Sequence, residues 1–392
     1  MTTLQAALPL VEDLLTPAGA TAEDRAAAVE LLADIATDVT GRPVTPGPVI
    51  VSSVPYAYGS PATGGLFRVG GRDRNGRPWS LFVKVLQHVR HWPGLVALPP
   101  GFAAQFAAEF PWRDELDLFT PEFADRLPPG LRVPRLGRMI DLGDDRLAVW
   151  MEDVPTDPGG WSLERFTRAA RLLGRFAARS ATPQVLARCP YPSNYALRKY
   201  AETAVPARGL APLADDELWS RPRLAGEGDL RGRLRGYGSR VPELLAGLDT
   251  LDQAMPHGDA SPQNLLVPSD APQQFVLIDI SFTSPHALGF DLGQLLVGLV
   301  HADELSPDRL PDVAAAIVPA YAAGLAEEGN RAGTDAVWRG FAASVLLRSG
   351  LDSMRYDLVD AEDNASVATF SHRVALTRFL LDLADDKIPT GW

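Results

Sequence analysis

The chain has 392 residues, of which 46% are hydrophobic and 22% charged, a composition that indicates a globular protein with two or three lobes and excludes a disordered chain. The net charge of −12 argues against a nucleic-acid or anionic-membrane partner, and the single Cys189 excludes an internal disulfide and a cysteine metal cluster. The sequence contains no run of 18 apolar residues and does not start with a basic leader, so we expect a cytoplasmic protein without a membrane segment.

The N-terminal part predicts two helices followed by a small sheet. Residues 1–45 predict the helices, which are separated at Pro17. Strands are predicted at residues 49–54, 66–69, 79–86 and 146–151. A glycine-rich loop over residues 58–65 separates the first two strands, and the hairpin signal Asn75-Gly76 precedes the third. Residues 102–119 predict a helix that is interrupted at Pro111.

The rest of the chain predicts helices. A linker rich in proline and glycine covers residues 155–160. Residues 163–178 then show an amphipathic helical pattern, and further helices are predicted to begin at Glu243, Asp291, Leu310, Thr334 and Val367. The sequence therefore predicts an α+β protein whose three parts are a helical extension, a small antiparallel sheet with one helix, and a mostly helical remainder, at residues 1–47, 48–154 and 155–392.

The most informative stretch is His257-Gly258-Asp259, with Asn264 five residues after the aspartate. A short apolar strand follows and ends in Asp279. Phosphoryl transfer needs one carboxylate to orient the attacking hydroxyl and two oxygen ligands to hold Mg²⁺ on the nucleotide phosphates. Asp259 fits the first role, and Asn264 and Asp279 fit the second. The alternative is an ordinary surface turn before a strand, because Asp, Ser, Pro and Asn all favour turns.

On His257-Gly258-Asp259, Asn264 and Ile278-Asp279, the chain resembles the aminoglycoside phosphotransferase family, the small-molecule branch of the protein-kinase-like fold. Protein kinases have His-Arg-Asp and Asp-Phe-Gly in these places. The resemblance covers about residues 48–300. It implies two lobes, an N-lobe with a small antiparallel sheet and a mostly helical C-lobe, with the nucleotide between them.

The resemblance also implies a role for Lys84, which lies in an apolar strand where lysine is disfavoured. It would contact the nucleotide phosphates and be held by a helical glutamate. Glu115 and Glu109 are the candidates, and Glu115 is preferred because its Arg113-Asp-Glu115 context is similar to that of the family. The structural alternative is a lysine whose stem covers the edge of a strand.

Two backbone segments are further candidates for nucleotide contacts. In the glycine-rich loop, N–H groups from Ser60 through Thr63 to Gly64 would approach phosphate oxygens. The loop is not a Walker A motif, because no lysine follows the second glycine, and a plain hairpin loop is the alternative. Glu152 to Val154 lie where the family has its inter-lobe hinge, so their backbone would contact the adenine edge. A buried strand end is the alternative there.

Two more residues are implied to support the catalytic loop. His257 would orient the loop rather than transfer protons, and Asp291 would hold the loop by hydrogen bonds. The alternative for Asp291 is a first-turn acid at a positive helix end. The acidic stretch from Asp352 to Asp363 would either face a cationic substrate or form a solvated loop.

These residues predict transfer of the γ-phosphoryl group of ATP or GTP, with Mg²⁺, to a hydroxyl of a small-molecule acceptor. Three functions are open: an antibiotic kinase that would confer resistance, a metabolic kinase for a sugar, amino alcohol or biosynthetic intermediate, and a nucleotide-binding protein without turnover. Intact Asp259, Asn264, Asp279 and Lys84 argue against the third. The acceptor, the choice between ATP and GTP, and the oligomeric state stay open.

Overall fold

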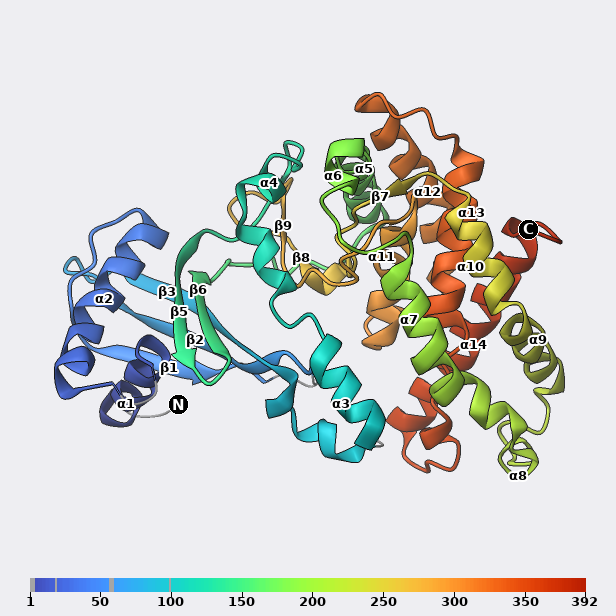
Figure 1. The fold of residues 1–392 in the computed structure, drawn as a ribbon, viewed down its shortest axis with the longest axis horizontal. Coiled ribbons are helices and arrows are strands. Elements are labelled where there is room, and N and C mark those ends of the chain that lie inside the picture. Colours follow the sequence, from blue (N-terminus) through green and yellow to red (C-terminus); the bar gives the residue numbers. More distant parts are fainter. Residues whose placement is uncertain (1–3, 18–19, 56–59, 99) are drawn as a thin grey trace. The chain divides into compact units, whose positions relative to one another are not determined.

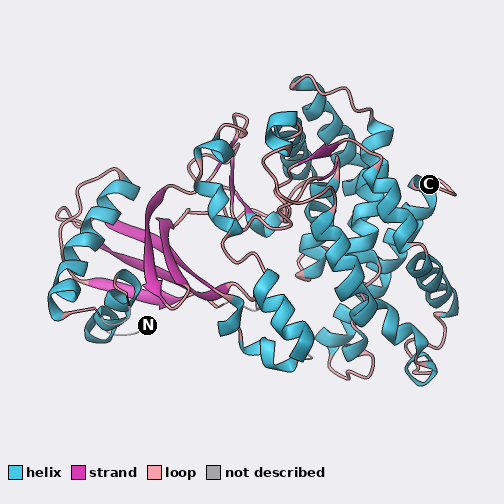
Figure 2. Cartoon of the chain, viewed as in Figure 1, coloured by secondary structure: helices cyan, strands magenta, loops and turns pink. Residues whose placement is uncertain are grey.

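The structure is a computed structural model that describes residues 4–17, 20–55, 60–98 and 100–392 (Figure 1). The chain divides into two compact units. Unit 1 consists of Met1–Thr120 and Val133–Pro155, and unit 2 of Pro121–Arg132 and Thr156–Trp392. Unit 1 carries the large antiparallel sheet and unit 2 is mostly helical (Figure 2). This architecture confirms the predicted α+β class.

Unit 1 is built on a five-stranded antiparallel sheet with the order β1-β2-β3-β6-β5. Its strands are β1 (Val49–Ser53), β2 (Thr63–Arg72), β3 (Pro78–Gln87), β5 (Leu136–Gly143) and β6 (Arg146–Glu152). The β2–β3 turn contains Gly76 at φ +76°, a conformation that suits the predicted Asn75-Gly76 hairpin. We did not predict β5 from the sequence, because Gly137 and the polar Arg138 and Asp141 interrupt its apolar pattern.

The two N-terminal helices share a hydrophobic core with this sheet. They are α1 (Leu4–Leu15) and α2 (Ala22–Thr40), and α2 begins with a capping box between Thr21 and Asp24. Ile35 of α2 is fully buried with Trp150 of β6, whose Nε1 donates to the Leu14 carbonyl over 3.1 Å. Full burial of one such aliphatic side chain contributes about 1.5–3 kcal/mol. Residues 1–47 are thus packed into unit 1.

The predicted helix over residues 102–119 is two elements. Helix α3 (Pro100–Glu109) ends just before Pro111, and a 3₁₀ helix, η3 (Asp114–Phe119), follows. Proline ends the helix because it lacks an N–H donor and its ring clashes with the preceding turn. Two short 3₁₀ helices, η1 (Val89–His91) and η2 (Pro93–Ala97), precede α3. Glu115 therefore lies on the 3₁₀ helix and not on a continuous α-helix.

Unit 2 is a helical assembly centred on α5 and α12. Its helices are α4 (Pro121–Ala124), α5 (Leu163–Ser180), α6 (Pro183–Leu186), α7 (Tyr195–Ala204), α8 (Asp216–Trp219), α9 (Gly228–Ser239), α10 (Val241–Asp249), α11 (Phe290–His301), α12 (Leu310–Glu327), α13 (Thr334–Val345) and α14 (Asn364–Lys387). The backbones of α5 and α12 approach closely, because a Cβ on Gly174 would lie 2.1 Å from the Tyr321 carbonyl oxygen. Of the longer helices, α7 and α9 were not predicted. Among the described residues, none of the helices has the length and apolar character needed to cross a membrane.

Two helices of unit 2 end in π-helical turns. Helix α7 runs into η4 (Val205–Leu210), and α13 runs into η8 (Leu346–Gly350), where the Leu351 N–H donates to the Leu346 carbonyl. Gly209 of η4 packs against the residue that follows η8, because a Cβ on Gly209 would lie 2.1 Å from the Leu351 carbonyl oxygen. Single π turns inside helices are uncommon and are frequent at functional sites.

Short strands hold the loops that carry the predicted catalytic residues. A three-stranded sheet has the order β4-β9-β8, from β4 (Leu131–Arg132), β8 (Leu265–Leu266) and β9 (Phe275–Leu277), and β7 (Gln253–Ala254) pairs with β10 (His286–Ala287). Strand β4 is parallel to β9, whereas β8 and β9 are antiparallel. The segment 121–132 lies in the chain between β3 and β5 of the unit 1 sheet and nevertheless belongs to unit 2.

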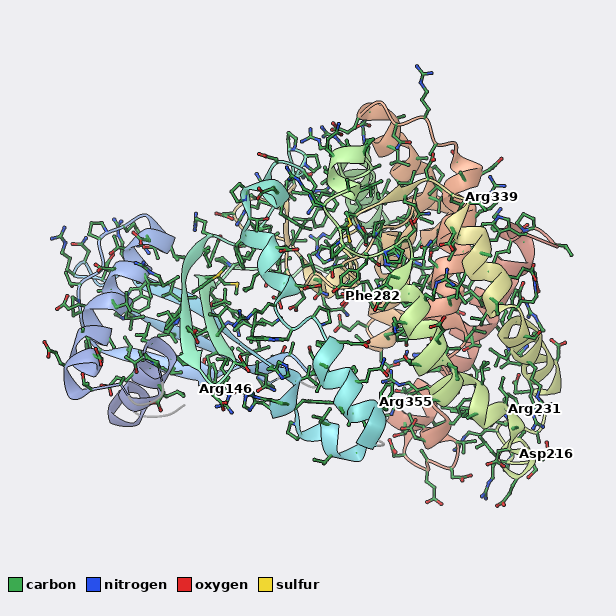
Figure 3. The ribbon with its side chains drawn as sticks, in the orientation of Figure 1. Arg146, Asp216, Arg231, Phe282, Arg339 and Arg355 are labelled. Carbon is green, nitrogen blue, oxygen red and sulfur yellow. The ribbon has the colours of Figure 1, made fainter. Side chains whose placement is uncertain are left out.

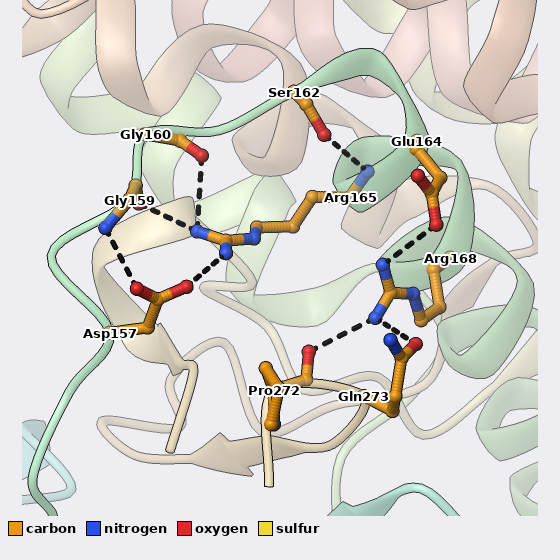
Figure 4. Close-up of polar contacts among 9 residues, drawn as sticks. All are labelled: Asp157, Gly159, Gly160, Ser162, Glu164, Arg165, Arg168, Pro272 and Gln273. Carbon is orange, nitrogen blue, oxygen red and sulfur yellow. Dashed lines mark hydrogen bonds and ion pairs between the residues drawn. The ribbon is translucent and has the colours of Figure 1, made fainter. Parts of the chain in front are cut away.

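A pair of arginines on α5 fixes the beginning of the second segment of unit 2, which starts at Thr156 (Figure 4). Arg165 contacts the Asp157 carboxylate over 2.6 Å and donates to the carbonyl oxygens of Gly159 and Gly160. Arg168, one turn later, donates to the Pro272 carbonyl in the β8–β9 turn. The linker after Pro155 is thereby attached to α5 and to the small sheet.

Candidate active site

The predicted catalytic loop is closed by its own side chains. Asn264 Nδ2 donates to the Asp259 carbonyl oxygen and to Asp259 Oδ2, each over 2.9 Å. Asn264 ends a short 3₁₀ helix, η6 (Pro262–Asn264), and is 9% exposed, whereas the Asp259 side chain is 32% exposed. The loop thus presents one carboxylate, while the amide nitrogen of Asn264 keeps it in place.

Gly258 is required by the shape of this loop. Its φ is +86°, and a Cβ at this position would lie only 1.5 Å from the Ser281 carbonyl oxygen. A residue with a side chain would therefore be strained and would also clash with backbone. The glycine of the His-Gly-Asp run lets the loop pass directly beside the segment that follows Asp279.

Asp291 attaches the catalytic loop to helix α11. Its Oδ2 accepts the His257 N–H over 3.0 Å, and its Oδ1 accepts the Gly258 N–H over 2.9 Å. Asp291 is 2% exposed, and burial raises its pKa to about 6 although the two N–H groups act in the opposite direction. It lies in the first turn of α11, whose N-cap is Gly289 at φ +99°.

His257 supports Asp259 through the backbone. Its Nδ1 accepts the Asp259 N–H over 3.2 Å, and the side chain is fully buried. Burial lowers the pKa of His257 to about 4, so the imidazole is neutral at pH 7. A neutral, buried imidazole that accepts a backbone hydrogen bond has the properties of a structural group.

The register of the small sheet brings Asn264 and Asp279 to the same end of the β8–β9 hairpin. Leu265 pairs with Leu277, and the Ile278 N–H donates to the Asn264 carbonyl over 3.1 Å. Asp279 follows one residue later, half-buried and with a left-handed φ of +57°. This backbone conformation is uncommon outside glycine and is found preferentially at functional sites.

These two residues fit a magnesium ion that is shared with a nucleotide. The contacts of Asn264 to Asp259 use its amide nitrogen, so the oxygen is the atom suited to a metal, and Asp279 adds a carboxylate. Mg²⁺ usually takes one or two protein oxygens and completes its shell with phosphates and water. Among the described residues, no group of three or more His, Cys, Asp and Glu side chains forms a site that would bind a metal by itself.

Arg348, which we did not predict, contacts the catalytic loop from the π turn η8. Its Nη2 donates to Asp259 Oδ1 over 2.9 Å, and its Nη1 donates to the Gly258 carbonyl oxygen. The guanidinium also lies 4.0 Å from the ring centroid of Phe282, which is labelled in Figure 3. The only sequence signal was an arginine in an otherwise apolar run, Val345-Leu-Leu-Arg348.

The acidic stretch near residue 352 divides into two parts. Asp352 is half-buried and accepts the Tyr200 hydroxyl over 2.5 Å, and burial raises its pKa to about 6. Asp357 is exposed and pairs with Arg355, and Asp363 is the N-cap of α14. Asp352 is therefore the one member of the three that bonds a half-buried side chain, and it lies four residues after Arg348.

In unit 1, Lys84 and Glu115 form an ion pair. Lys84 Nζ lies 2.6 Å from Glu115 Oε2, and their side chains are 10% and 18% exposed. Lys84 sits on β3, opposite Leu66 of β2 and Val149 of β6. Glu109, the other candidate, is exposed and accepts a hydrogen bond from a neighbour on its own helix. A lysine this buried needs a charged partner, and Glu115 is that partner.

The glycine-rich loop is described from Ser60 onward, so Tyr58 and Gly59 lie outside the described residues. Strand β2 begins at Thr63, three residues earlier than predicted, and its pairing with β3 is irregular between Thr63 and Gly65. A Cβ on Gly64 would lie 2.9 Å from the side-chain oxygen of Gln87. The end of the loop therefore packs closely against Gln87, the last residue of β3.

At the end of β6, acidic side chains are occupied within unit 1. The Glu152 carboxylate accepts the Arg135 N–H, and the Asp153 carboxylate accepts from Ser80 and Arg68. The Glu152 N–H donates to the Arg135 carbonyl, so it takes part in the sheet. Of the backbone groups predicted to contact the adenine edge, the Glu152 carbonyl and the backbone of Val154 are therefore the ones on which the hinge prediction depends.

Several solved phosphotransferase and kinase structures align with this chain. An aminoglycoside phosphotransferase from Alicyclobacillus acidocaldarius subsp. acidocaldarius DSM 446 aligns with a TM-score of 0.50 and 14% identity, over 86% of this chain and 92% of that chain. The amicoumacin kinase hAmiN, in complex with AMP-PNP and Ca²⁺, aligns with a TM-score of 0.47, 14% identity and coverages of 86% and 89%. Spectinomycin phosphotransferase, in complex with ADP and spectinomycin, aligns with a TM-score of 0.49 and 9% identity, over 86% of this chain and 92% of that chain.

No protein-family model and no curated protein matches the sequence. The first of the three alignments shows that the chain has the protein-kinase-like fold of an aminoglycoside phosphotransferase. The resemblance predicted from His257-Gly258-Asp259, Asn264 and Asp279 is confirmed at the level of the fold.

Proposed function

We propose that this chain is a small-molecule kinase that transfers the γ-phosphoryl group of ATP or GTP to a hydroxyl of an antibiotic or related natural product. The observation that carries the proposal is the closed loop in which Asn264 holds the Asp259 carboxylate while the register of β8 and β9 brings Asp279 to the same end of the hairpin. An ordinary surface turn does not require a buried aspartate to hold its backbone, whereas Asp291 of α11 accepts two backbone N–H groups of this loop.

In this proposal each residue has one task. Asp259 accepts a hydrogen bond from the acceptor hydroxyl and aligns it with the phosphorus atom. Asn264 and Asp279 hold Mg²⁺, which when bound neutralises charge on the phosphates. Lys84, kept in place by Glu115, contacts phosphate oxygens from unit 1. His257 and Asp291 maintain the loop conformation.

The nucleotide contacts are supported by the shape of the described backbone. Ser60, Thr63 and Gly64 lie just before or at the start of β2, which pairs with the lysine strand β3. Their N–H groups are the proposed phosphate contacts, and the Thr63 N–H would have to exchange the Ser60 carbonyl, to which it donates over 3.1 Å, for a phosphate oxygen. The Glu152 carbonyl and the Val154 N–H are the proposed adenine contacts. Phosphotransfer to an antibiotic would make the protein a resistance enzyme, and a metabolic hydroxyl acceptor would use the same residues.

The test is phosphoryl transfer from Mg²⁺-ATP and Mg²⁺-GTP to a panel of hydroxylated antibiotics, sugars and amino alcohols, scored by release of nucleoside diphosphate. The Asp259→Asn variant should keep nucleotide affinity and lose turnover by a factor on the order of 10² or more. The Asp279→Ala variant should lose Mg²⁺-dependent nucleotide binding in calorimetry.

Asp270→Asn is the matched control, because Asp270 is an exposed aspartate in the β8–β9 turn of the same hairpin. It should behave as wild type in both assays. Full turnover in Asp259→Asn would remove Asp259 from the mechanism. A wild type that binds nucleotide but phosphorylates none of the panel would favour the nucleotide-binding protein without turnover.

A further inference from the structure

The Asp259 carboxylate is held on both of its oxygens. Asn264 Nδ2 occupies Oδ2, and Arg348 Nη2 occupies Oδ1, each over 2.9 Å. Arg348 Nη1 donates to the Gly258 carbonyl oxygen of the same loop. One guanidinium therefore fixes both the backbone before the carboxylate and the carboxylate itself.

Arg348 also packs against two neighbouring aromatic rings. Its guanidinium carbon lies 4.0 Å from the ring centroid of Phe282 and 5.5 Å from that of Phe290, and the side chain is 12% exposed. Phe282 follows Asp279 by three residues and has a left-handed φ of +49°. The ring is thus supplied by the segment that carries the proposed metal ligand and that lies beside Gly258.

The π turn affects the direction in which the Arg348 side chain leaves its helix. Arg348 lies in the middle of η8, where the Leu351 N–H bonds to the Leu346 carbonyl five residues earlier. An inserted residue of this kind rotates the side chains that follow by about 100° relative to a regular helix. The turn costs regular hydrogen bonds, and it occurs where Arg348 meets Asp259.

A purely structural role is a poor explanation for this pair. Taking a guanidinium and a carboxylate out of water costs several kcal/mol per ion, and an apolar pair of similar size is often at least as stable. A planar guanidinium that donates from Nη2 to the carboxylate and from Nη1 to the Gly258 carbonyl is instead suited to fixing the carboxylate relative to the loop backbone.

We propose that Arg348 is a positioning residue for Asp259: together with Asn264 it sets the direction in which the carboxylate meets the acceptor hydroxyl. Each carboxylate oxygen has two lone pairs, so one remains on each oxygen for the acceptor. With both oxygens held, the carboxylate cannot turn about its last bond, and the acceptor hydroxyl has a fixed approach. The role of the acceptor rests on the proposed function, whereas the hold on Asp259 does not.

The test uses the full-length protein and two substitutions. Arg348→Met keeps the apolar stem over Phe282 and removes all donors, and Arg348→Lys keeps the charge and one donor. Crystal structures of the wild type and both variants, without acceptor, show the orientation of Asp259 directly. We expect Asp259 to leave its wild-type rotamer, or to occupy several, in Arg348→Met and to keep it in Arg348→Lys.

The kinetic arm measures Mg²⁺-ATP hydrolysis, in which water takes the place of the acceptor. In Arg348→Met we expect kcat to fall by a factor on the order of 10², the usual effect of a reacting group displaced by about 1 Å, while KM for Mg²⁺-ATP stays within about twofold. Arg348→Lys should restore part of kcat relative to Arg348→Met.

Arg233→Met is the control for losing a paired arginine, because Arg233 bonds to Asp382 and Asp385 on the surface of unit 2. Its kcat should match the wild type. An unmoved Asp259 in the Arg348→Met crystal would overturn the proposal whatever the kinetics, as would an unchanged kcat. A wild type that neither binds nor hydrolyses nucleotide would count against the proposed function, and the crystallographic comparison would still decide the role of Arg348.

Discussion

The contact between Asp291 and the catalytic loop leads to a prediction about stability. Asp291→Ala removes two hydrogen bonds from the His257 and Gly258 N–H groups to a carboxylate that is 2% exposed. Two bonds to a charged acceptor are worth about 3–6 kcal/mol together. Burial of the charge opposes this, because it raises the pKa to about 6 even with the two bonds in place. The net loss at pH 7 should be about 2 kcal/mol.

The same residue predicts the direction of the pH dependence. Because the folded-state pKa of Asp291 lies above that of the unfolded chain, the folded protein binds a proton between about pH 4 and pH 6 that the unfolded chain releases. The contribution of Asp291 to stability therefore rises as the pH falls from 7 to 5, by about 1 kcal/mol. The difference between wild type and Asp291→Ala should widen by that amount.

Urea denaturation at pH 7 and pH 5 measures these free energies, and hydrogen exchange of the amides at His257 and Gly258 reports the loop directly. Asp335→Ala is the matched control, since Asp335 is an exposed acid in the first turn of α13. It should cost less than about 0.5–1 kcal/mol, the ordinary value for an acid at a helix start. If Asp291→Ala is no worse than Asp335→Ala, or if the difference narrows at pH 5, the loop is not held as described.

Two further substitutions test the geometry of the site. Glu115→Gln should lower kcat/KM roughly tenfold or more, because Lys84 loses its charged partner. Glu109→Gln should stay within about twofold of wild type. Steady-state kinetics on both variants measures the two effects, and a larger loss in Glu109→Gln would contradict the pairing of Lys84 with Glu115. Gly258→Ala should destabilise unit 2 by about 2–5 kcal/mol, because its Cβ would meet the Ser281 carbonyl at 1.5 Å and its φ is +86°. A melting temperature equal to that of wild type would refute this.

The sequence predicted the parts of the site whose residues are close together in the chain. Asp259 and Asn264 are five residues apart and Asp279 follows one short hairpin later, so their spacing alone reflects the geometry. Lys84 was visible because a lysine in an apolar strand is uncommon. Asp291 was visible by resemblance, and its buried position distinguishes it from an ordinary helix-start acid.

Arg348 could not be predicted because nothing local marks it. It lies on a helix whose apolar pattern is the same for a regular helix and for one with a π turn, and its partner Asp259 is remote in sequence. Strand β5 was missed for a different reason. Gly137, Arg138 and Asp141 interrupt its apolar pattern, and its residues are all half-exposed or exposed.

The parallel pairing of β4 with β9 has a consequence for synthesis of the protein on the ribosome. Leu131 pairs with Phe275, so β4 emerges long before the strand that it needs. Contacts of such long sequence separation form slowly. An unpaired strand edge on a growing chain is also a site for mistaken association. A nascent chain that stops after β6 would contain all strands of the unit 1 sheet, but its segment 121–132 would still lack its partners in unit 2. We therefore expect the need for chaperones to be greatest between synthesis of β6 and synthesis of β9.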